Sequence, residues 1–341
     1  MTTPSFDIIV PVWNNPTETR ACLVSILDST ETARLIIINN GCDRATELML
    51  EEFCDHLGDR AIYMTMERNI GFVPALNRAL ARSNADWALI VRPTGTLSSL
   101  CMQKVIDATA SKQAGIITPF CPSEHLPPHV LVKKNCTCLE TSEISFAQLA
   151  ISRVMREKIG FFDDDLDGGP LCLQDYRQRA SAGGFMVYLL PTIVVEGHTA
   201  TVFGSSERRR RIEDHALAVF FKRWGIQRHF AVYLPREMEE THLCTMLELL
   251  LGAARRGHRF ELLLHQRQYK MAMQHCAACL HSGIVLHKLA TLTPLRSLAG
   301  TMVKLMAHDS KLEAVCGLDG IPFPGYGTAL PATTLSKLGT S

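Results

Sequence analysis

Asp7-Ile-Ile-Val-Pro-Val-Trp-Asn14, close to the start of the chain, is an apolar run that ends in a polar turn. Most of its residues are branched and aliphatic, with little alternation of polar and apolar positions, which is typical of a strand covered on both faces. Four similar runs follow, at Leu35–Ile38, Ala61–Met64, Trp87–Val91 and Gly115–Thr118. Helical stretches begin between them, near Pro16, Arg44, Gly71 and Leu97. This alternation predicts a three-layer α/β domain built from βα units around a parallel sheet.

Polar, turn-forming residues follow each of the first four predicted strands. In open sheets of this kind, ligands bind beyond the carboxyl ends of the strands, so these loops are expected to line one binding edge. The loops contain Trp13-Asn14-Asn15, Asn39-Asn40-Gly41, Glu67-Arg68-Asn69-Ile70-Gly71 and Arg92-Pro93-Thr94-Gly95.

The middle of the chain is less periodic and contains an acidic segment, Phe161–Gly169. A helix is predicted over Leu171–Ala182, with Gly183-Gly184 as its C-terminal stop. Phe185–Leu190 then has the composition of a strand, which Pro191 is expected to break.

The last third of the chain predicts a second, smaller α/β domain. An amphipathic helix opens at the basic run Arg208–Arg211 and extends to about Trp224. Strands are then predicted at Ala231–Leu234, Phe260–His265, Ile284–Leu289 and Leu312–Gly317, and helices at Met238–Arg256, Gln266–His281 and Pro294–Ala307. The expected organisation is therefore a first domain over residues 1–204, a connecting helix over 205–230, a small α/β domain over 231–320 and an irregular tail over 321–341.

Composition limits the classes of protein to consider. The chain has 341 residues, of which 47% are hydrophobic and 20% charged, as in ordinary globular proteins, and its net charge of +1 does not favour nucleic acid as a partner. Its apolar runs are far shorter than the roughly 20 residues that span a bilayer, and its start does not have the pattern of a signal peptide. The twelve cysteines are scattered and are expected to be reduced. We therefore expect a cytoplasmic protein whose membrane contact, where it has one, is peripheral.

The four loops, in this order and spacing, resemble those of family 2 glycosyltransferases with the GT-A fold, particularly the rhamnosyltransferase-like bacterial branch, over about residues 5–225. The resemblance implies that the turn at Pro11, Trp13 and Asn14 receives the nucleotide base. It implies the same for Asn39, which occupies the place of the family's base-binding aspartate and can still present an amide.

Asn69-Ile-Gly-Phe-Val-Pro-Ala-Leu-Asn77 is similar to the family's third motif, at the start of a helix. By this resemblance, Gly71 lets the backbone approach the ligand, and Asn69 and Asn77 make polar contacts near the nucleotide.

The fourth loop departs from the family's Asp-x-Asp pattern. Thr94 stands at the place of the aspartate that ligates a divalent cation in the family, and Arg92 at the place of an asparagine. A hydroxyl is a poor ligand for Mg²⁺ or Mn²⁺, so we assign no metal ligand here. Two interpretations remain: Arg92 binds the donor diphosphate directly in place of a cation, or Arg92 is a solvated strand-end residue and the donor chemistry has been lost.

Asp175 lies in a segment that resembles the family's Glu-Asp helix start, with Gln174 in place of the glutamate. The resemblance implies that Asp175 is the general base for the acceptor hydroxyl. The alternative is an aspartate favoured only by the helix dipole. His198 similarly matches a family histidine that faces the diphosphate or metal, and its alternative is a structural histidine.

The function implied is transfer of a sugar from a nucleoside-diphosphate sugar to a hydroxyl acceptor on a glycan, lipid carrier or protein, with inversion, as in cell-envelope polysaccharide biosynthesis. The rival interpretation is a catalytically inactive protein of the same fold that binds a nucleotide or partner. A sugar nucleotidyltransferase would need a glycine-rich loop with a lysine after the first strand, and Trp13-Asn14-Asn15 does not provide one. The cysteine pairs Cys136/Cys138 and Cys276/Cys279 lack the further ligands of a zinc site, and Arg208–Arg211 is interpreted as a solvated helix face rather than a lipid contact.

Overall fold

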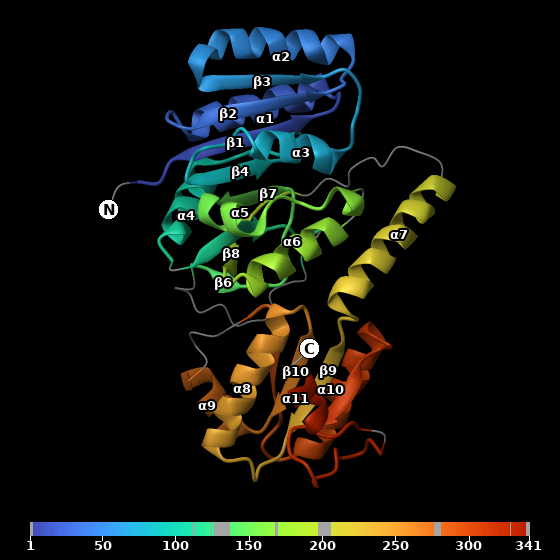
Figure 1. The fold of residues 1–341 in the computed structure, drawn as a ribbon. Coiled ribbons are helices and arrows are strands. Elements are labelled where there is room, and N and C mark those ends of the chain that lie inside the picture. The colour runs from blue at the N-terminus through green and yellow to red at the C-terminus, as the bar shows by residue number, and fades with distance from the viewer. Residues whose placement is uncertain are drawn as a thin grey trace. The chain divides into compact units, whose positions relative to one another are not determined.

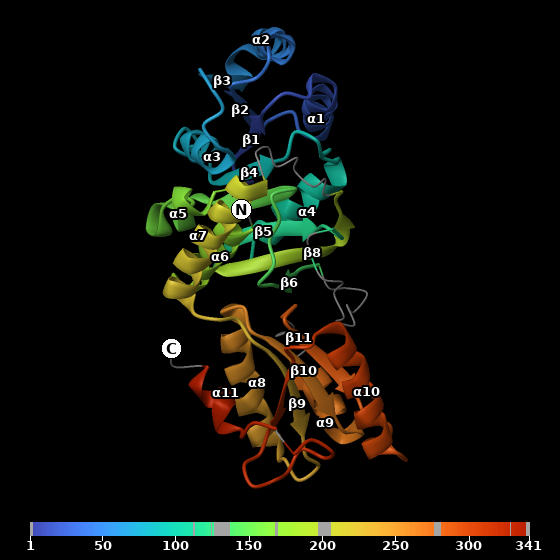
Figure 2. The ribbon, with the colours of Figure 1, turned by 90° about the vertical axis from the view of Figure 1, so that its right-hand side faces the viewer.

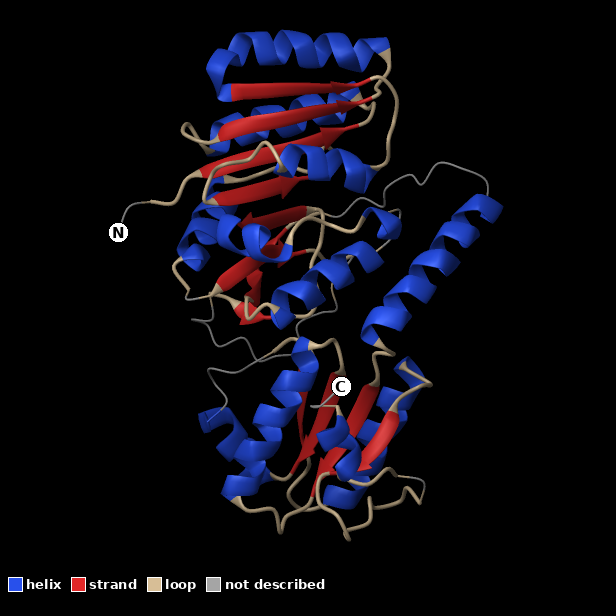
Figure 3. Ribbon diagram, in the orientation of Figure 1, coloured by secondary structure: helices blue, strands red, loops and turns tan. Residues whose placement is uncertain are grey.

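The structure is a computed structural model that describes residues 3–111, 113–123, 125, 137–167, 170–196, 206–275, 281–327 and 329–338. The chain forms two compact units, with the main division after Gly225 (Figure 1). Each unit has a sheet with helices on both faces (Figure 3), so the predicted fold class is confirmed. Among the described residues, no helix is long and apolar enough to cross a membrane.

The N-terminal sheet has eight strands in the order β3-β2-β1-β4-β7-β5-β8-β6. Its strands are β1 (Phe6–Val12), β2 (Arg34–Asn40), β3 (Ala61–Met66), β4 (Trp87–Val91), β5 (Ala114–Phe120), β6 (Leu139–Glu140), β7 (Gln148–Ser152) and β8 (Met186–Val194). All five strands predicted before residue 120 are confirmed. The sheet is not wholly parallel, however, because the unpredicted β7 lies antiparallel between β4 and β5.

Helices cover both faces of this sheet (Figure 2). They are α1 (Pro16–Ser29), α2 (Arg44–Leu57), α3 (Phe72–Leu80), α4 (Ser99–Thr109), α5 (Arg153–Ile159), α6 (Leu171–Ala182) and α7 (Ser206–Trp224). Alternate residues of β1 enter different cores: Ile8 and Val10 pack with α1, α2 and α4, whereas Ile9 packs with α3, α5 and α6. Burial on both faces explains why the strands have almost no polar alternation.

Pro191 does not break its strand, contrary to the prediction. β8 continues to Val194, and its register with β5 shifts, so that Pro119 lies opposite Leu190 while Phe120 lies opposite Val194. Such an irregularity leaves residues outside the hydrogen-bond ladder, and a proline there loses no ladder bond.

The C-terminal unit contains a four-stranded parallel sheet in the order β11-β10-β9-β12. Its elements are β9 (His229–Leu234), α8 (Glu240–Arg255), β10 (Arg259–Leu264), α9 (Gln266–His275), β11 (Ile284–Lys288), α10 (Pro294–His308), β12 (Glu313–Cys316) and α11 (Thr333–Lys337). The predicted βα series is confirmed. The tail is less irregular than expected, because α11 lies in it and both Phe323 and Leu335 are buried.

Candidate active site

The carboxyl ends of β1, β2 and β3 lie at one edge of the N-terminal sheet. These strands are parallel neighbours, with Val12 opposite Asn39 and Asn40 opposite Met66. β4 is the parallel neighbour of β1 on its other side. The topology therefore gathers the four predicted loops at the edge where α/β sheets bind ligands.

The turn after β1 has an unusual backbone. Asn14 and Asn15 both adopt left-handed conformations, with φ of 58° and 57°, which asparagine tolerates better than most residues. The Asn14 backbone N–H donates to Cys42 Sγ at 3.2 Å, and its Oδ1 accepts from the Asp43 N–H at 2.8 Å. These bonds fix the turn that contains the predicted residues Pro11, Trp13 and Asn14 against the loop after β2.

Asn39, the predicted base-binding residue, is buried and engaged within the protein. Its Oδ1 accepts from the Cys42 N–H at 2.8 Å, and its Nδ2 donates to the Tyr63 hydroxyl at 3.1 Å. The side chain thus shapes the loop after β2, and a base would have to share or displace one of these bonds.

The neighbouring Asn40 organises the third loop, a role that the sequence analysis missed. Its Nδ2 donates to Asn69 Oδ1 at 3.2 Å and to the Gly71 carbonyl at 3.0 Å, and its Oδ1 accepts from the Ile70 N–H at 3.1 Å. Asn69 Oδ1 also accepts from the Gly71 N–H at 2.9 Å. The structure therefore brings Asn69 and Gly71 to the edge, held there by Asn40.

Gly71 is required by a close approach to the chain's own acidic segment. Its φ is +101°, and a Cβ atom would lie 2.2 Å from Asp167 Oδ2. Asp167 Oδ1 accepts from the Val73 N–H at 3.1 Å, at the start of α3. The group that lies against the Gly71 backbone in this structure is therefore the Asp167 carboxylate.

Asn77 is committed to the same segment. Its Nδ2 donates to the Phe162 carbonyl at 2.9 Å and to Asp164 Oδ1 at 2.7 Å, and its Oδ1 accepts from the Phe162 N–H at 3.1 Å. Asn77 therefore joins α3 to the acidic segment, and a nucleotide would have to share or displace these bonds.

The loop after β4 is a tight turn that carries Arg92 and Thr94. The Gly95 N–H donates to the Arg92 carbonyl at 2.9 Å, and the Arg92 N–H donates to the Ala147 carbonyl at 3.2 Å. Both side chains are partly exposed. Within the described part of the chain, no three His, Cys, Asp or Glu side chains converge as metal ligands.

Asp175 is the centre of a buried ion cluster. Its side chain is 0% exposed, and Oδ2 accepts from Arg179 Nε at 2.7 Å. Oδ1 accepts from Arg223 Nη1 at 2.6 Å and from Trp224 Nε1 at 2.9 Å. Both carboxylate oxygens therefore already have charged or strongly polar donors.

Asp163 shares one of these donors. Arg223 Nη2 donates to Asp163 Oδ2 at 2.8 Å. The hydrogen bonds to Asp175 and Asp163 raise the pKa of Arg223 above its ordinary value. Burial works against the charged form of Asp163, yet the bond from Arg223 holds the pKa of this carboxyl below its usual value.

The position of Asp175 does not support the helix-dipole alternative. It is the fifth residue of α6, whose first turn has no acidic residue, and the dipole acts mainly within that turn. The motifs in the sequence do not point to Arg179, Arg223 or Trp224. Arg179 could have been found from its i,i+4 spacing to Asp175, whereas the other two lie 48 and 49 residues away. His198, Cys136, Cys276 and Cys279 lie outside the described residues.

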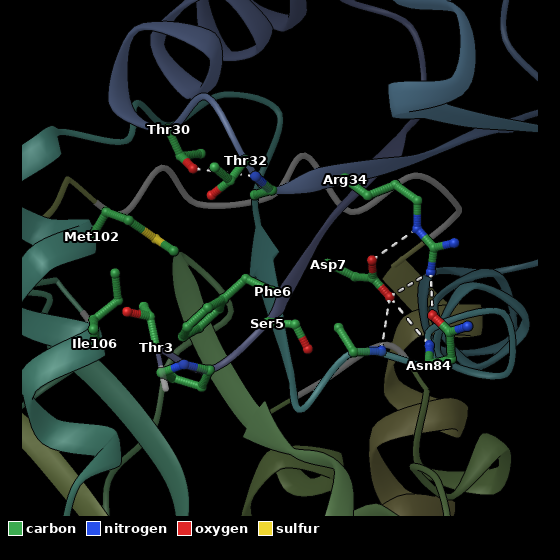
Figure 4. Close-up of a pocket in the computed structure, with 13 residues that line it drawn as sticks. Thr3, Ser5, Phe6, Asp7, Thr30, Thr32, Arg34, Asn84, Met102 and Ile106 are labelled. Carbon is green, nitrogen blue, oxygen red and sulfur yellow. Dashed lines mark hydrogen bonds and ion pairs between the residues drawn. The ribbon is translucent and has the colours of Figure 1, made fainter. Parts of the chain in front are cut away.

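A cavity of about 490 Å³ lies at the other, amino edge of the same sheet (Figure 4). Asp7 in its wall accepts from Arg34 Nε and Nη2, both at 2.9 Å, and from the backbone N–H groups of Asn84 and Ala85. Burial works against the charged form of Asp7, but these bonds keep the pKa of its carboxyl below the usual value. The Asp7 carboxylate is thus used to clamp this end of the sheet, and the carboxyl edge is the better candidate for chemistry.

Residues 7–116 match the family model described as glycosyl transferase family 2. The match covers the four loops, so it confirms the resemblance in that part of the chain. It ends before Asp175 and does not test the resemblance around that residue. It does not single out the rhamnosyltransferase-like branch. No curated protein matches the sequence.

Solved structures show the fold. The mannosyltransferase PcManGT from Pyrobaculum calidifontis, in complex with GDP-Man and Mn²⁺, is 13% identical, with a TM-score of 0.51 over 91% of this chain and 82% of that chain. S. aureus TarS 1-349 in complex with UDP-GlcNAc is 13% identical, with a TM-score of 0.50 over 70% of this chain and 69% of that chain. GalNAc-T7 with UDP, GalNAc and Mn²⁺ is 11% identical, with a TM-score of 0.51 over 64% of this chain and 50% of that chain. The N-terminal unit accordingly has the GT-A fold of these glycosyltransferase structures.

Proposed function

We propose that this protein is a glycosyltransferase that moves a sugar from a nucleoside-diphosphate sugar to a hydroxyl on a glycan, lipid carrier or protein, with inversion. The observation that carries the proposal is the gathering of the four family 2 loops at the carboxyl edge of a GT-A sheet. Solved structures with this fold contain GDP-Man or UDP-GlcNAc, which supports a nucleotide sugar as the donor.

In the proposed reaction, the acceptor oxygen attacks the anomeric carbon as Asp175 takes the hydroxyl proton. The bond between the anomeric carbon and the diphosphate oxygen breaks, and the nucleoside diphosphate leaves with its electron pair. A base must reach the hydroxyl within hydrogen-bond distance. Asp175 is fully buried and accepts from Arg179, Arg223 and Trp224, so the hydroxyl of the acceptor can reach it only if one of these side chains moves. Arg223 is the more exposed of the two arginines, at 38%, so we expect the Arg223 side chain to move away from Asp175.

We propose that Arg92 binds the departing diphosphate. Charge builds on these oxygens as the sugar leaves, and a guanidinium can bind two of them at once. Thr94 is a weak cation ligand beside it. A divalent cation held by other residues is the competing arrangement, and removal of the cation distinguishes the two.

A second function has a specific observation in its favour. The burial of Asp175 among three of the chain's own hydrogen-bond donors is what a protein without transfer activity would retain, with the ion cluster serving only to hold α7 in place. Such a protein would bind a nucleotide or a partner at the same edge.

Calorimetric titration of the full chain with UDP, GDP and dTDP tests the shared premise. We expect one of them to bind in the micromolar to millimolar range, and Asn40→Ala to abolish binding because it loosens the loop of Asn69 and Gly71. Failure of all three nucleotides to bind at millimolar concentration would exclude both functions. Binding without hydrolysis of any matching nucleotide sugar would favour the inactive protein.

A further inference from the structure

The C-terminal unit exposes a row of apolar side chains along α10 and at Leu292 just before it, which we call the stripe. Leu292 is 95% exposed, Leu295 61%, Val303 66% and Met306 43%. Ala299 between them is also exposed. Leu295, Ala299, Val303 and Met306 are three or four residues apart on α10, so at 3.6 residues per turn they line one side of the helix, and Leu292 lies two residues before the helix begins.

The stripe lies beside the side of α10 that packs into the unit. Leu298 and Met302 point inward and are buried in a core with Tyr233 and Leu263. Figure 2 shows α10 along the outside of the four-stranded sheet. Single exposed apolar residues are ordinary, but a continuous exposed stripe of this kind marks an interaction surface.

The helix that carries the stripe has two cations, Arg296 and Lys304, and no acidic residue. From Lys288 to Lys311 the chain carries four exposed cations, which are Lys288, Arg296, Lys304 and Lys311. The one acidic residue in this range, Asp309, bonds to His229 Nδ1 at 2.8 Å. The whole chain has a net charge of only +1, so this segment is more basic than the chain as a whole.

We propose that α10 docks the C-terminal unit onto an anionic lipid bilayer, with the stripe among the acyl chains near the interface and the cations at the head-group phosphates. An apolar face bordered by Lys and Arg is the composition of interfacial helices, and each cation near an anionic surface adds to the attraction. A second copy of the chain would bring the same cations together, which opposes pairing, whereas anionic lipid complements them. This inference does not depend on the proposed transfer reaction.

Co-sedimentation of the full chain with lipid vesicles tests it. We expect binding to vesicles of equal parts phosphatidylglycerol and phosphatidylcholine, little binding to phosphatidylcholine alone, and weaker binding as salt screens the charges. Leu292→Ser with Leu295→Ser should lower the bound fraction about tenfold or more. Arg296→Glu with Lys304→Glu should lower it on the phosphatidylglycerol vesicles only.

Leu48→Ser with Leu100→Ser is the matched control, because these leucines are 48% and 61% exposed on helices of the N-terminal unit. It should leave vesicle binding unchanged. The proposal is overturned if the wild-type chain does not bind the anionic vesicles, or if the control loses as much binding as the Leu292/Leu295 variant. It is also overturned if sedimentation equilibrium shows a dimer that the Leu292/Leu295 variant abolishes while vesicle binding persists, since the stripe would then be a self-association surface.

Discussion

Arg223 Nη1 lies 2.6 Å from Asp175 Oδ1, and Nη2 of the same guanidinium lies 2.8 Å from Asp163 Oδ2. One side chain at the end of α7 therefore joins the proposed base on α6 to the acidic segment that packs against α3. Through Asn77 and Gly71, that segment also reaches the third loop of the donor edge. The acceptor and donor halves of the candidate site are thus linked by a continuous set of contacts within the N-terminal unit.

Removing Arg223 should destabilise this unit. Arg223→Gln leaves a buried carboxylate with fewer donors, and because Arg223 is 38% exposed, the loss should be about 1–3 kcal/mol rather than the larger cost of a fully buried pair. All three tryptophans lie in the N-terminal unit, so tryptophan fluorescence in urea follows that unit. The control is Arg44→Gln, which breaks an exposed pair with Glu47 and should change the urea midpoint far less, because solvent screens such a pair. Equal losses in the two variants would show that the cluster contributes no more than a surface pair.

The strands, and the sheet edge at which the four loops gather, could be predicted because they follow from local composition. Runs such as Leu35–Ile38 are apolar on both faces only when helices cover both faces of the sheet. β7 was missed since its five residues lie in a stretch without periodicity and its antiparallel pairing depends on two distant strands. Pro191 was misjudged for a similar reason, because the register shift opposite it is a property of the assembled sheet.

The order of the motifs could place the predicted loops at one edge of the sheet, but it could not predict the contacts within them. Motif order places Asn39, Gly71 and Asn77 at the edge, yet it does not say that their side chains or backbones contact Tyr63, Asp167 and Asp164. Arg223 and Trp224 could not be assigned to Asp175 from sequence because nothing in a single chain pairs positions so far apart.

Gly71→Ala should disturb the donor edge through sterics and backbone strain. The new Cβ would lie 2.2 Å from Asp167 Oδ2, and the φ of +101° is unfavourable for alanine. We expect a loss of about 1–3 kcal/mol in the urea transition of the N-terminal unit. Combining it with Asp167→Ala should remove the steric part and leave the backbone part, so the two losses should be less than additive. Strict additivity would mean that the two residues do not meet.

In the C-terminal unit, His229 bonds to Asp309 and Glu261, and His287 bonds to the same Glu261. We expect this histidine cluster to stabilise the unit most between about pH 4.5 and 6.5. Burial alone would lower the pKa of His229, but its bonds to Glu261 and Asp309 raise it above the ordinary 6.5. That contribution is complete below pH 6.5 and is lost as pH rises through the raised value. Burial alone would raise the pKa of Glu261, but bonds from His229 and His287 lower it to about 2, so its contribution is present above pH 4.5 and is lost as pH falls toward 2.

Thermal unfolding followed by circular dichroism measures this effect, with tryptophan fluorescence used to separate the transition of the N-terminal unit. His229→Gln should reduce the difference in stability between pH 5.5 and pH 8.5. His242→Gln, on the exposed side of α8, should leave the difference unchanged. A pH dependence that survives His229→Gln would place its origin outside this cluster.

Arg92→Ala should weaken nucleoside-diphosphate binding by about 1.5–3 kcal/mol, the scale of a charge-assisted contact, while EDTA has little effect on the wild-type chain. Thr94→Asp should then introduce a dependence on Mn²⁺, because it restores a carboxylate at that position. Calorimetry measures both, with Arg82→Ala as the control at an exposed position after α3. If the wild-type chain loses binding in EDTA, a cation held by other residues binds the diphosphate. If neither EDTA nor Arg92→Ala changes the affinity, the diphosphate does not bind at this loop.

Asp175→Asn should lower turnover about 10²-fold, the usual cost of losing a general base, while changing nucleotide affinity by no more than about twofold. The readout is hydrolysis, with water as the acceptor, of the nucleotide sugar whose nucleotide binds most tightly.

The Asp175→Asn substitution would also loosen the two arginines, so the control must loosen them without removing the base. Asp163→Asn does this, since it frees one arm of Arg223 and leaves the Asp175 carboxylate in place, and it should retain most of the turnover. If both variants lose turnover equally, the integrity of the cluster rather than a proton transfer to Asp175 controls the reaction. If Asp175→Asn remains fully active, the proton goes to another group and Asp175 only anchors α7.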